Sequence, residues 1–169
     1  MHYNELEKRL MAIDEEAYLT FPEEKRMNIV IAGGSALIFQ KVLSRSSNDI
    51  DALSVDNKLI DIIEKYDMNI NVRTYLDFFP CDYLKRANLI YSGRKVDFYA
   101  LSLEDIVISK LFSSRRTDRN DIISKEVTEK LDWEKLDKIV KSDEICFLNE
   151  RIQKDYMYDY EEYVRRYKK

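Results

Sequence analysis

Two carboxylates flank an apolar residue at Asp49-Ile50-Asp51, fifteen residues after a glycine pair at Gly33-Gly34. On a β-strand, residues i and i+2 face the same side, so Asp49 and Asp51 project together while Ile50 enters the packing. Two like charges held this close are costly unless a cation lies between them. Oxygen ligands favour a hard ion, so the pair predicts a Mg²⁺ or Mn²⁺ site.

The glycine pair follows an apolar, β-branched run over 28–32, which predicts a strand, and it precedes an apolar helix over 36–39. Glycine lacks a Cβ, so a turn built from Gly33 and Gly34 approaches a ligand closely. The following helix start offers unpaired N–H groups to a phosphate, and Ser35 adds a hydroxyl. Alone, the pair would be an ordinary turn; its order with the two carboxylates favours a nucleotide-phosphate site.

These two segments resemble the signature of the DNA-polymerase-β-like nucleotidyltransferase superfamily, especially its small prokaryotic branch with toxin–antitoxin and abortive-infection proteins. Many members carry Arg-x-Thr-x-Asp-hydrophobic-Asp. Here Arg45 takes the arginine position, and Ser47 keeps a hydroxyl where threonine is common. The resemblance implies that both residues bind the nucleotide. It covers roughly residues 28–123, and its further matches are Pro80, Tyr83, Arg86, Val96-Asp97-Phe98, Leu103-Glu104-Asp105, Lys110 and Arg119-Asn120-Asp121-Ile122.

A third carboxylate has two candidates, because Leu76-Asp77-Phe78 and Val96-Asp97-Phe98 both have the hydrophobic–acid–hydrophobic form that the family uses. We favour Asp97, which lies on the cleaner predicted strand and keeps the expected distance before Leu103-Glu104-Asp105. The resemblance implies that Asp97 completes the metal site and accepts the proton of the attacking hydroxyl. Asp77 remains the alternative, and the solvent side of a hairpin strand is the other interpretation of Asp97.

Lys110 lies beside the inward stripe of its predicted helix. The resemblance directs it at the triphosphate, whereas the alternative is a lysine that passes the core with its charged end in water. For the charged run over 115–121, the resemblance implies that Asp121 braces the site. It also implies contacts to phosphate or to the acceptor from three arginines, namely Arg115, Arg116 and Arg119. The alternative is a solvated helix start capped by Asp118 or Asp121.

The chain has 169 residues, of which 45% are hydrophobic, which fits one domain with an ordinary core. We expect a single nucleotidyltransferase-like domain over 1–169, with an αβ core in 1–123 and a helical tail over 124–169 packed on it. The 28 basic and 32 acidic residues argue against a surface made wholly for nucleic acid. Cys81 and Cys146 lack metal spacing, and the lone His2 excludes histidine-based triads and zinc sites.

The expected fold class is α+β, with a mixed sheet of about four or five strands flanked by helices and a helical C-terminal third. Beyond the elements named above, we predict a helix over 3–19, a strand over 70–78 and a hairpin around Ser92-Gly93-Arg94. Asp56 and Ser102 are predicted helix caps. Tyrosines at helical spacing, namely Tyr156, Tyr160, Tyr163 and Tyr167, are typical of core or interface, with base stacking as the alternative.

The sequence therefore predicts a metal-dependent nucleotidyltransferase that uses a nucleoside triphosphate. Its acceptor would be a hydroxyl of RNA such as tRNA, of a protein or of a small molecule, within a toxin–antitoxin or phage-defence system with a cognate toxin or antitoxin partner. The competing hypothesis is a catalytically silent binding protein of the same fold, an antitoxin or nucleotide-responsive adaptor. A third is a structural partner with a tyrosine-rich interface. Without a signal peptide or a run of 18 apolar residues, we expect a cytoplasmic protein without membrane contact.

Overall fold

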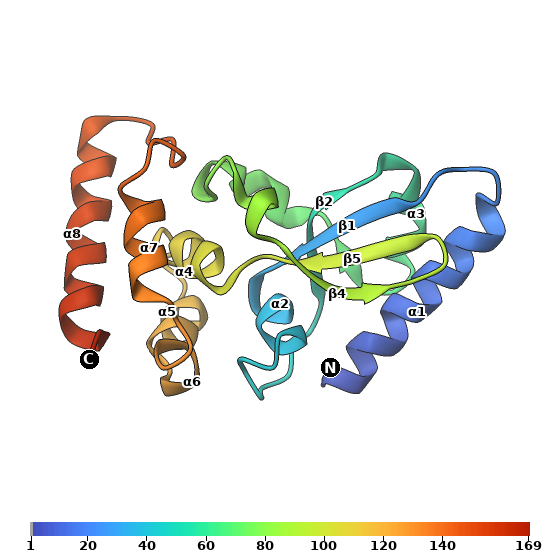
Figure 1. Ribbon diagram of the computed structural model, residues 1–169, viewed down its shortest axis with the longest axis horizontal. Helices are drawn as coiled ribbons and strands as arrows, with labels where there is room; N and C mark the ends of the chain where they lie inside the picture. The colour runs from blue at the N-terminus through green and yellow to red at the C-terminus, as the bar shows by residue number, and fades with distance from the viewer. Residues whose placement is uncertain (1) are drawn as a thin grey trace. The chain divides into compact units, whose positions relative to one another are not determined.

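A five-stranded mixed sheet with the strand order β3-β2-β1-β5-β4 organises the first part of the chain (Figure 1). The computed structural model describes residues 2–169. The chain divides into two units. The first runs to Leu76 and includes Arg86–Leu101, and the second comprises Asp77–Lys85 and Ser102–Lys169. That the two units act as one domain stays a prediction.

The first unit combines the sheet with helices, and the central strand of the sheet is β1. Strand β1 pairs with β2 in the antiparallel sense and with β5 in the parallel sense. The hairpin partner β4 is antiparallel to β5, and the short β3 runs parallel to β2. The elements are α1 (Tyr3–Thr20), β1 (Met27–Ala32), α2 (Gly33–Phe39), β2 (Ile50–Val55), η1 (Asn57–Leu59), α3 (Ile60–Glu64), β3 (Met68–Asn69), β4 (Asn88–Ser92) and β5 (Val96–Ala100). The α+β mixed-sheet prediction is confirmed.

Helix α1 supplies one side of the core of the first unit. Its predicted stripe of Leu6, Leu10, Ile13 and Ala17 is buried, and α1 packs against β5, α2 and α3. The opposing side chains from the sheet include Phe98, which is also fully buried. Each buried leucine, isoleucine or phenylalanine contributes roughly 2 kcal/mol relative to an exposed position. This packing holds the strands that carry the candidate site.

A buried carboxylate ties α1 to the β4–β5 hairpin. Asp14 accepts hydrogen bonds from the backbone N–H groups of Arg94, Lys95 and Val96, at 2.9, 2.7 and 2.8 Å. Gly93 occupies the turn because a Cβ there would collide with the Asp14 carboxylate. The predicted hairpin is confirmed, and α1 fixes its turn.

The predicted strand over 70–78 is wrong. Strand β3 ends at Asn69, and the chain continues as the 3-10 segment η2 (Asn71–Phe78). The backbone N–H of Asn71 donates to Asn69 Oδ1 at 2.9 Å, a local turn that competes with strand pairing. The Arg73 guanidinium then donates to the carbonyl of Val55 at 2.9 Å, which satisfies a β2 carbonyl beyond the end of the β2–β3 ladder.

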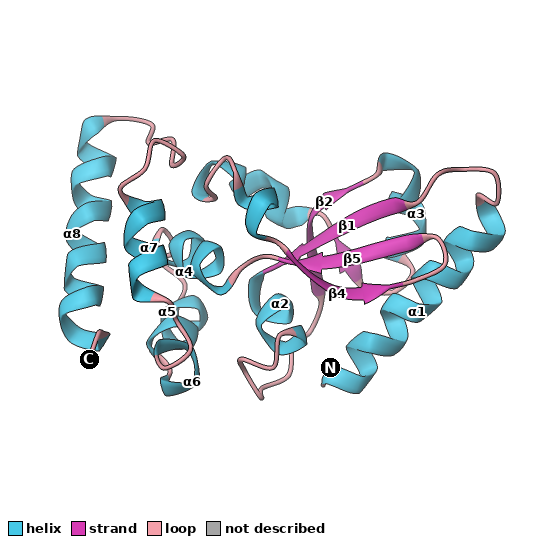
Figure 2. Cartoon of the chain, in the orientation of Figure 1, coloured by secondary structure: helices cyan, strands magenta, loops and turns pink. Residues whose placement is uncertain are grey.

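The second unit is built from helices (Figure 2). Ser102 caps α4 as predicted: its Oγ accepts from the N–H of Asp105 at 3.2 Å and donates to Asp105 Oδ2 at 2.6 Å. The elements are η3 (Tyr83–Arg86), at the point where the chain returns to the first unit, and then α4 (Leu103–Leu111), α5 (Arg116–Ile123), α6 (Lys125–Thr128), α7 (Trp133–Val140) and α8 (Glu150–Tyr167). None of the helices within residues 2–169 is long and apolar enough to cross a membrane.

The tyrosines of α8 are packing residues of the second unit. Tyr156, Tyr160 and Tyr163 are each less than 5% exposed. Their hydroxyls donate to the Ile108 carbonyl, to Asp137 Oδ1 and to the Ile122 carbonyl, at 3.2, 2.9 and 2.6 Å, and so tie α8 to α4, α7 and α5. The core interpretation of the stripe is confirmed for these three residues, whose rings are too buried to stack on bases.

Candidate functional site

The glycine turn and the second acidic residue, Asp51, lie against each other where β1 ends and α2 begins. The last residue of β1, Ala32, is paired with Asp51 in β2. Gly33 follows with a φ of +64°, and a Cβ built on it would lie only 2.7 Å from Asp51 Oδ2. Only glycine adopts this conformation without strain and lets the carboxylate approach the backbone so closely. The structure thus brings the predicted turn and Asp51 together.

Asp49 lies one residue before β2, exposed to solvent, and an asparagine side chain holds it. Asn69 Nδ2 donates to Asp49 Oδ2 at 3.0 Å, and Asn69 is paired with Asp51 across the parallel β2–β3 ladder. The oxygen of the same amide accepts the N–H of Asn71, which orients the NH₂ group toward Asp49. Asn69 therefore links both predicted metal ligands. The sequence analysis missed it, because an Asn-x-Asn pattern indicates a local turn but not its neighbours across the sheet.

Arg45 lies across the second glycine of the turn. A Cβ on Gly34 would collide with the Arg45 guanidinium, so the arginine packs directly on the glycine backbone. Its Nη1 also donates to the carbonyl of Ser46 at 2.9 Å. The cation predicted to bind the nucleotide is therefore placed at the start of α2, beside the glycine turn.

The two predicted site serines make backbone contacts. Ser35 is buried, and its Oγ donates to the Ala32 carbonyl at 3.2 Å, so it closes the strand-to-helix turn. Ser47 Oγ donates to the Asp49 carbonyl at 2.9 Å and shapes the loop that presents the first carboxylate. In this structure both hydroxyls are positioned by, and help to fix, the backbone of the candidate site.

Asp97 does not lie with the other two carboxylates, and its assignment to their metal site is corrected. The ladder pairs Asp97 with Asn28, near the first residue of β1, whereas Asp51 pairs with Ala32 at its last. Four strand residues span about 13 Å. Among residues 2–169, no three histidine, cysteine, aspartate or glutamate side chains are grouped to hold a metal. The hydrophobic–acid–hydrophobic pattern indicates which face a residue occupies, but not at which end of the sheet it lies.

Asp97 instead belongs to an ion pair with Arg26. Both nitrogens Nε and Nη2 of Arg26 donate to its carboxylate, and Ser92 Oγ donates to Asp97 Oδ1 at 2.6 Å. The Arg26 hydrogen bonds are the main reason that the pKa of the Asp97 carboxyl lies below its usual range. The alternative third carboxylate, Asp77, is exposed within η2 and belongs to the second unit.

Lys110 is a buried cation held by two carboxylates of the second unit. Its Nζ forms ion pairs with Asp118 and, at 3.1 Å, with Asp121. Ser113 Oγ donates to the second oxygen of Asp118 at 2.7 Å. Asp121, which was expected to brace the site, thus contacts Lys110, and Asp118 is a further member of the cluster. That Lys110 meets the triphosphate stays a prediction.

The three predicted arginines differ in exposure. Arg115 and Arg116 project into solvent at the start of α5. Arg119 is half-buried, and it donates to the Ser113 carbonyl at 3.0 Å and pairs with Asp159 at 3.3 Å. Arg119 is therefore engaged in packing α5 against α8, while Arg115 and Arg116 are the more exposed of the three.

The sequence that carries the glycine turn, the two carboxylates and the lysine cluster matches a known protein family. A family model described as "nucleotidyltransferase of unknown function" (DUF6036) matches residues 8–168. The chain belongs to this family. No curated protein and no solved structure matches it. Membership confirms the coarser prediction of a nucleotidyltransferase family, and the matched residues continue through α8.

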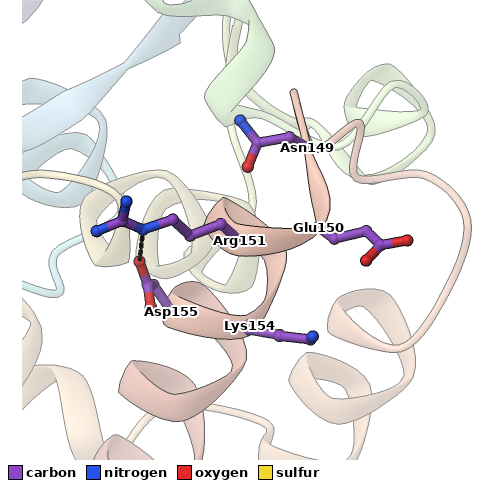
Figure 3. A pocket seen from close by; sticks show the side chains of 5 residues that line it. All are labelled: Asn149, Glu150, Arg151, Lys154 and Asp155. Atoms are coloured by element: carbon purple, nitrogen blue, oxygen red, sulfur yellow. Dashed lines mark ion pairs between the residues drawn. The ribbon is translucent and has the colours of Figure 1, made fainter.

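One hollow on this nucleotidyltransferase-family protein is lined by none of the predicted site residues. It surrounds the start of α8 and is lined by Asn149, Glu150, Arg151, Lys154 and Asp155 (Figure 3). Arg151 reaches toward Asp155, with Nε 4.0 Å from Oδ2, while Glu150 and Lys154 project in another direction. Asn149 is the helix cap and accepts the N–H of Ile152 at 2.9 Å. These contacts are those of an ordinary solvated helix start.

Proposed function

We propose that this protein transfers a nucleoside monophosphate from a nucleoside triphosphate to a hydroxyl acceptor, with Asp49 and Asp51 as the ligands of a divalent metal ion. The observation that carries the proposal is the close approach of Asp51 to the Gly33 backbone, at the strand end where Asn69 also holds Asp49. Two carboxylates beside a backbone cradle fit a metal ion that is shared with substrate phosphates.

The chemistry of the ligands favours Mg²⁺ or Mn²⁺. Both carboxylates offer hard oxygen donors, and Mg²⁺ typically binds one or two of these while phosphates and water complete its shell. When bound, the ion would neutralise phosphate charge and polarise the reacting phosphoryl group. The chain itself would bind and orient the triphosphate: the glycines allow close backbone approach, and Arg45 supplies a cation beside Gly34. Asn69 would keep the Asp49 carboxylate in position.

The exposed arginines and the resemblance indicate the acceptor and the biological setting that we propose. The exposed Arg115 and Arg116 would meet the phosphate backbone of an RNA such as tRNA, and protein or small-molecule hydroxyls are the other candidate acceptors. The resemblance to the small prokaryotic branch supports a role in a toxin–antitoxin or phage-defence system, with a cognate protein partner in the cytoplasm. The second candidate function is a nucleotide-binding protein of the same fold without turnover.

A transfer assay tests the proposal. The protein is incubated with Mg²⁺, total RNA and each ribonucleoside triphosphate labelled at the α-phosphate, and the products are separated by size. We expect a labelled acceptor with the wild type, and a loss of about a thousandfold in rate for Asp49→Asn, because several kcal/mol of transition-state stabilisation would be removed. If no triphosphate labels RNA, protein or small molecule while nucleotide binding still depends on Asp49, the binding-protein hypothesis replaces the enzyme.

Substitution of the turn glycine provides a second prediction. Gly33→Ala should cost about 1–2 kcal/mol of stability, because φ is positive there. The new Cβ should also push Asp51 away and so weaken Mg²⁺-dependent nucleotide binding, measured by calorimetry. Gly93→Ala is the matched control, since its Cβ collides with the carboxylate of Asp14 instead. That variant should lose stability but bind nucleotide normally. If both variants lose nucleotide affinity equally, Gly33 is not part of the nucleotide site.

A further inference from the structure

Two exposed thiols from distant parts of the sequence meet in the second unit. The sulfur atoms of Cys81 and Cys146 lie 3.5 Å apart, although 65 positions separate them in the sequence. Both cysteines are free and exposed to solvent. Cys81 lies in the short segment 77–85, and Cys146 lies in the loop between α7 and α8. The sequence analysis found no role for either.

Contacts other than the thiols hold these two segments together. The backbone N–H of Cys81 donates to the Glu144 carbonyl at 2.7 Å. Phe78 lies three residues before Cys81, and Phe147 follows Cys146 directly. Phe78 stacks on Phe112 with ring centroids 5.0 Å apart, and Phe147 packs on the same ring at 6.0 Å. The sulfurs are therefore neighbours because a hydrogen bond and a shared aromatic contact fix both backbones.

We propose that Cys81 and Cys146 form a reversible intramolecular disulfide when the protein meets a peroxide or a small-molecule disulfide. With hydrogen peroxide, one thiolate attacks an oxygen, giving a sulfenic acid and releasing water after protonation. The second thiol then displaces the hydroxyl from that sulfur, so two thiols and one peroxide yield one disulfide and two waters. With oxidised glutathione, two exchange steps yield the disulfide and two reduced glutathiones.

The exposure of both thiols and the raised pKa of Cys81 decide how the pair is oxidised. A disulfide needs the sulfurs at about 2 Å, and the two side chains that must rotate to reach this distance are exposed to solvent. The hydrogen bond with the Cys146 sulfur, burial and the nearby charges of Glu144 and Asp82 all raise the pKa of the Cys81 thiol. Because the thiolate is the nucleophile, the oxidation rate should increase as the pH rises.

Mass spectrometry of the full chain tests the proposal. Reduced protein is treated with hydrogen peroxide or with oxidised glutathione, then digested without reductant. We expect an intact mass lower by two hydrogens, one cross-linked peptide containing both cysteines, and full reversal by dithiothreitol. Cys81→Ser and Cys146→Ser should give no such peptide. Oxidation of the wild type to separate sulfinic acids, to two glutathione adducts or only to covalent dimers would overturn the proposal.

Thermal unfolding provides an independent readout. The cross-link would close a long loop and so restrict the unfolded chain, which should raise the Tm of the oxidised wild type by about 5–10 °C. Neither serine variant should show this rise under the same treatment. A lower Tm for the cross-linked protein would mean that the bond distorts the unit, which contradicts a pair whose backbones already hold the sulfurs 3.5 Å apart.

Discussion

Asp51→Asn should abolish the joint stabilisation of this protein by a divalent metal and a nucleoside triphosphate. A ligand at a hundred times its Kd stabilises the native state by about 2.7 kcal/mol, which raises the Tm of a chain of this length by about 5–10 °C. Because the carboxylates and the glycine turn would share the metal with the triphosphate, the wild type should respond more to both ligands together than to the sum of each. The neutral amide removes the charge that couples them.

Two matched variants show whether the loss is specific. Asp61→Asn neutralises an exposed carboxylate of the same unit in α3 and should keep the full joint response. Asp97→Asn should keep it too, at the cost of about 1 kcal/mol of stability, because it only breaks the half-exposed pair with Arg26. Differential scanning fluorimetry with Mg²⁺, ATP and both measures the effect. A full response in Asp51→Asn, or its loss in Asp97→Asn, would place the metal elsewhere.

Local sequence signals predicted the elements that surround the site. The Asp56 and Ser102 caps and the turn at Gly93 all act through residues within three positions, so their chemistry is visible in the sequence. The core stripe of α1 was equally predictable, because its spacing follows the helix period. The adjacency of Gly33 and Asp51 was also predicted, although the backbone conformation that requires glycine appears only in the structure.

Pairing between strands could not be predicted in the same way. Alternation assigns Asp97 to a face, but its end of the sheet depends on β5 running parallel to β1, which residues distant in sequence decide. Asn69 was missed for the same reason, because its contact with Asp49 crosses the β2–β3 ladder. The strand predicted over 70–78 does not form, because a side-chain-to-backbone hydrogen bond ends β3 at Asn69. Errors of this kind affect which residues meet across the sheet and where a strand ends.

The ion pairs of Lys110 predict a large loss of stability in Lys110→Met. The lysine side chain is 7% exposed, and those of Asp118 and Asp121 are 15% and 6% exposed. Removing the cation leaves two desolvated carboxylates without their partner, which should cost about 3–5 kcal/mol in urea unfolding at pH 7. Lys141→Met is the control: it breaks an exposed pair with Asp137 and should cost less than about 1 kcal/mol.

The pH dependence distinguishes this cause from simple loss of packing. Burial raises the pKa of the Asp118 carboxyl, but the hydrogen bond and charge of Lys110 outweigh it, so the folded-state pKa lies below the unfolded value of about 3.9. In the wild type this stabilisation is therefore present above that value and is lost as the pH falls through the folded pKa. Without Lys110, burial dominates and the pKa of Asp118 rises. Protonation of Asp118 then removes a buried, unpaired charge and lessens the stability loss of the variant. The stability difference between wild type and Lys110→Met should shrink steadily from pH 7 to pH 4, and a constant difference would assign the loss to packing alone.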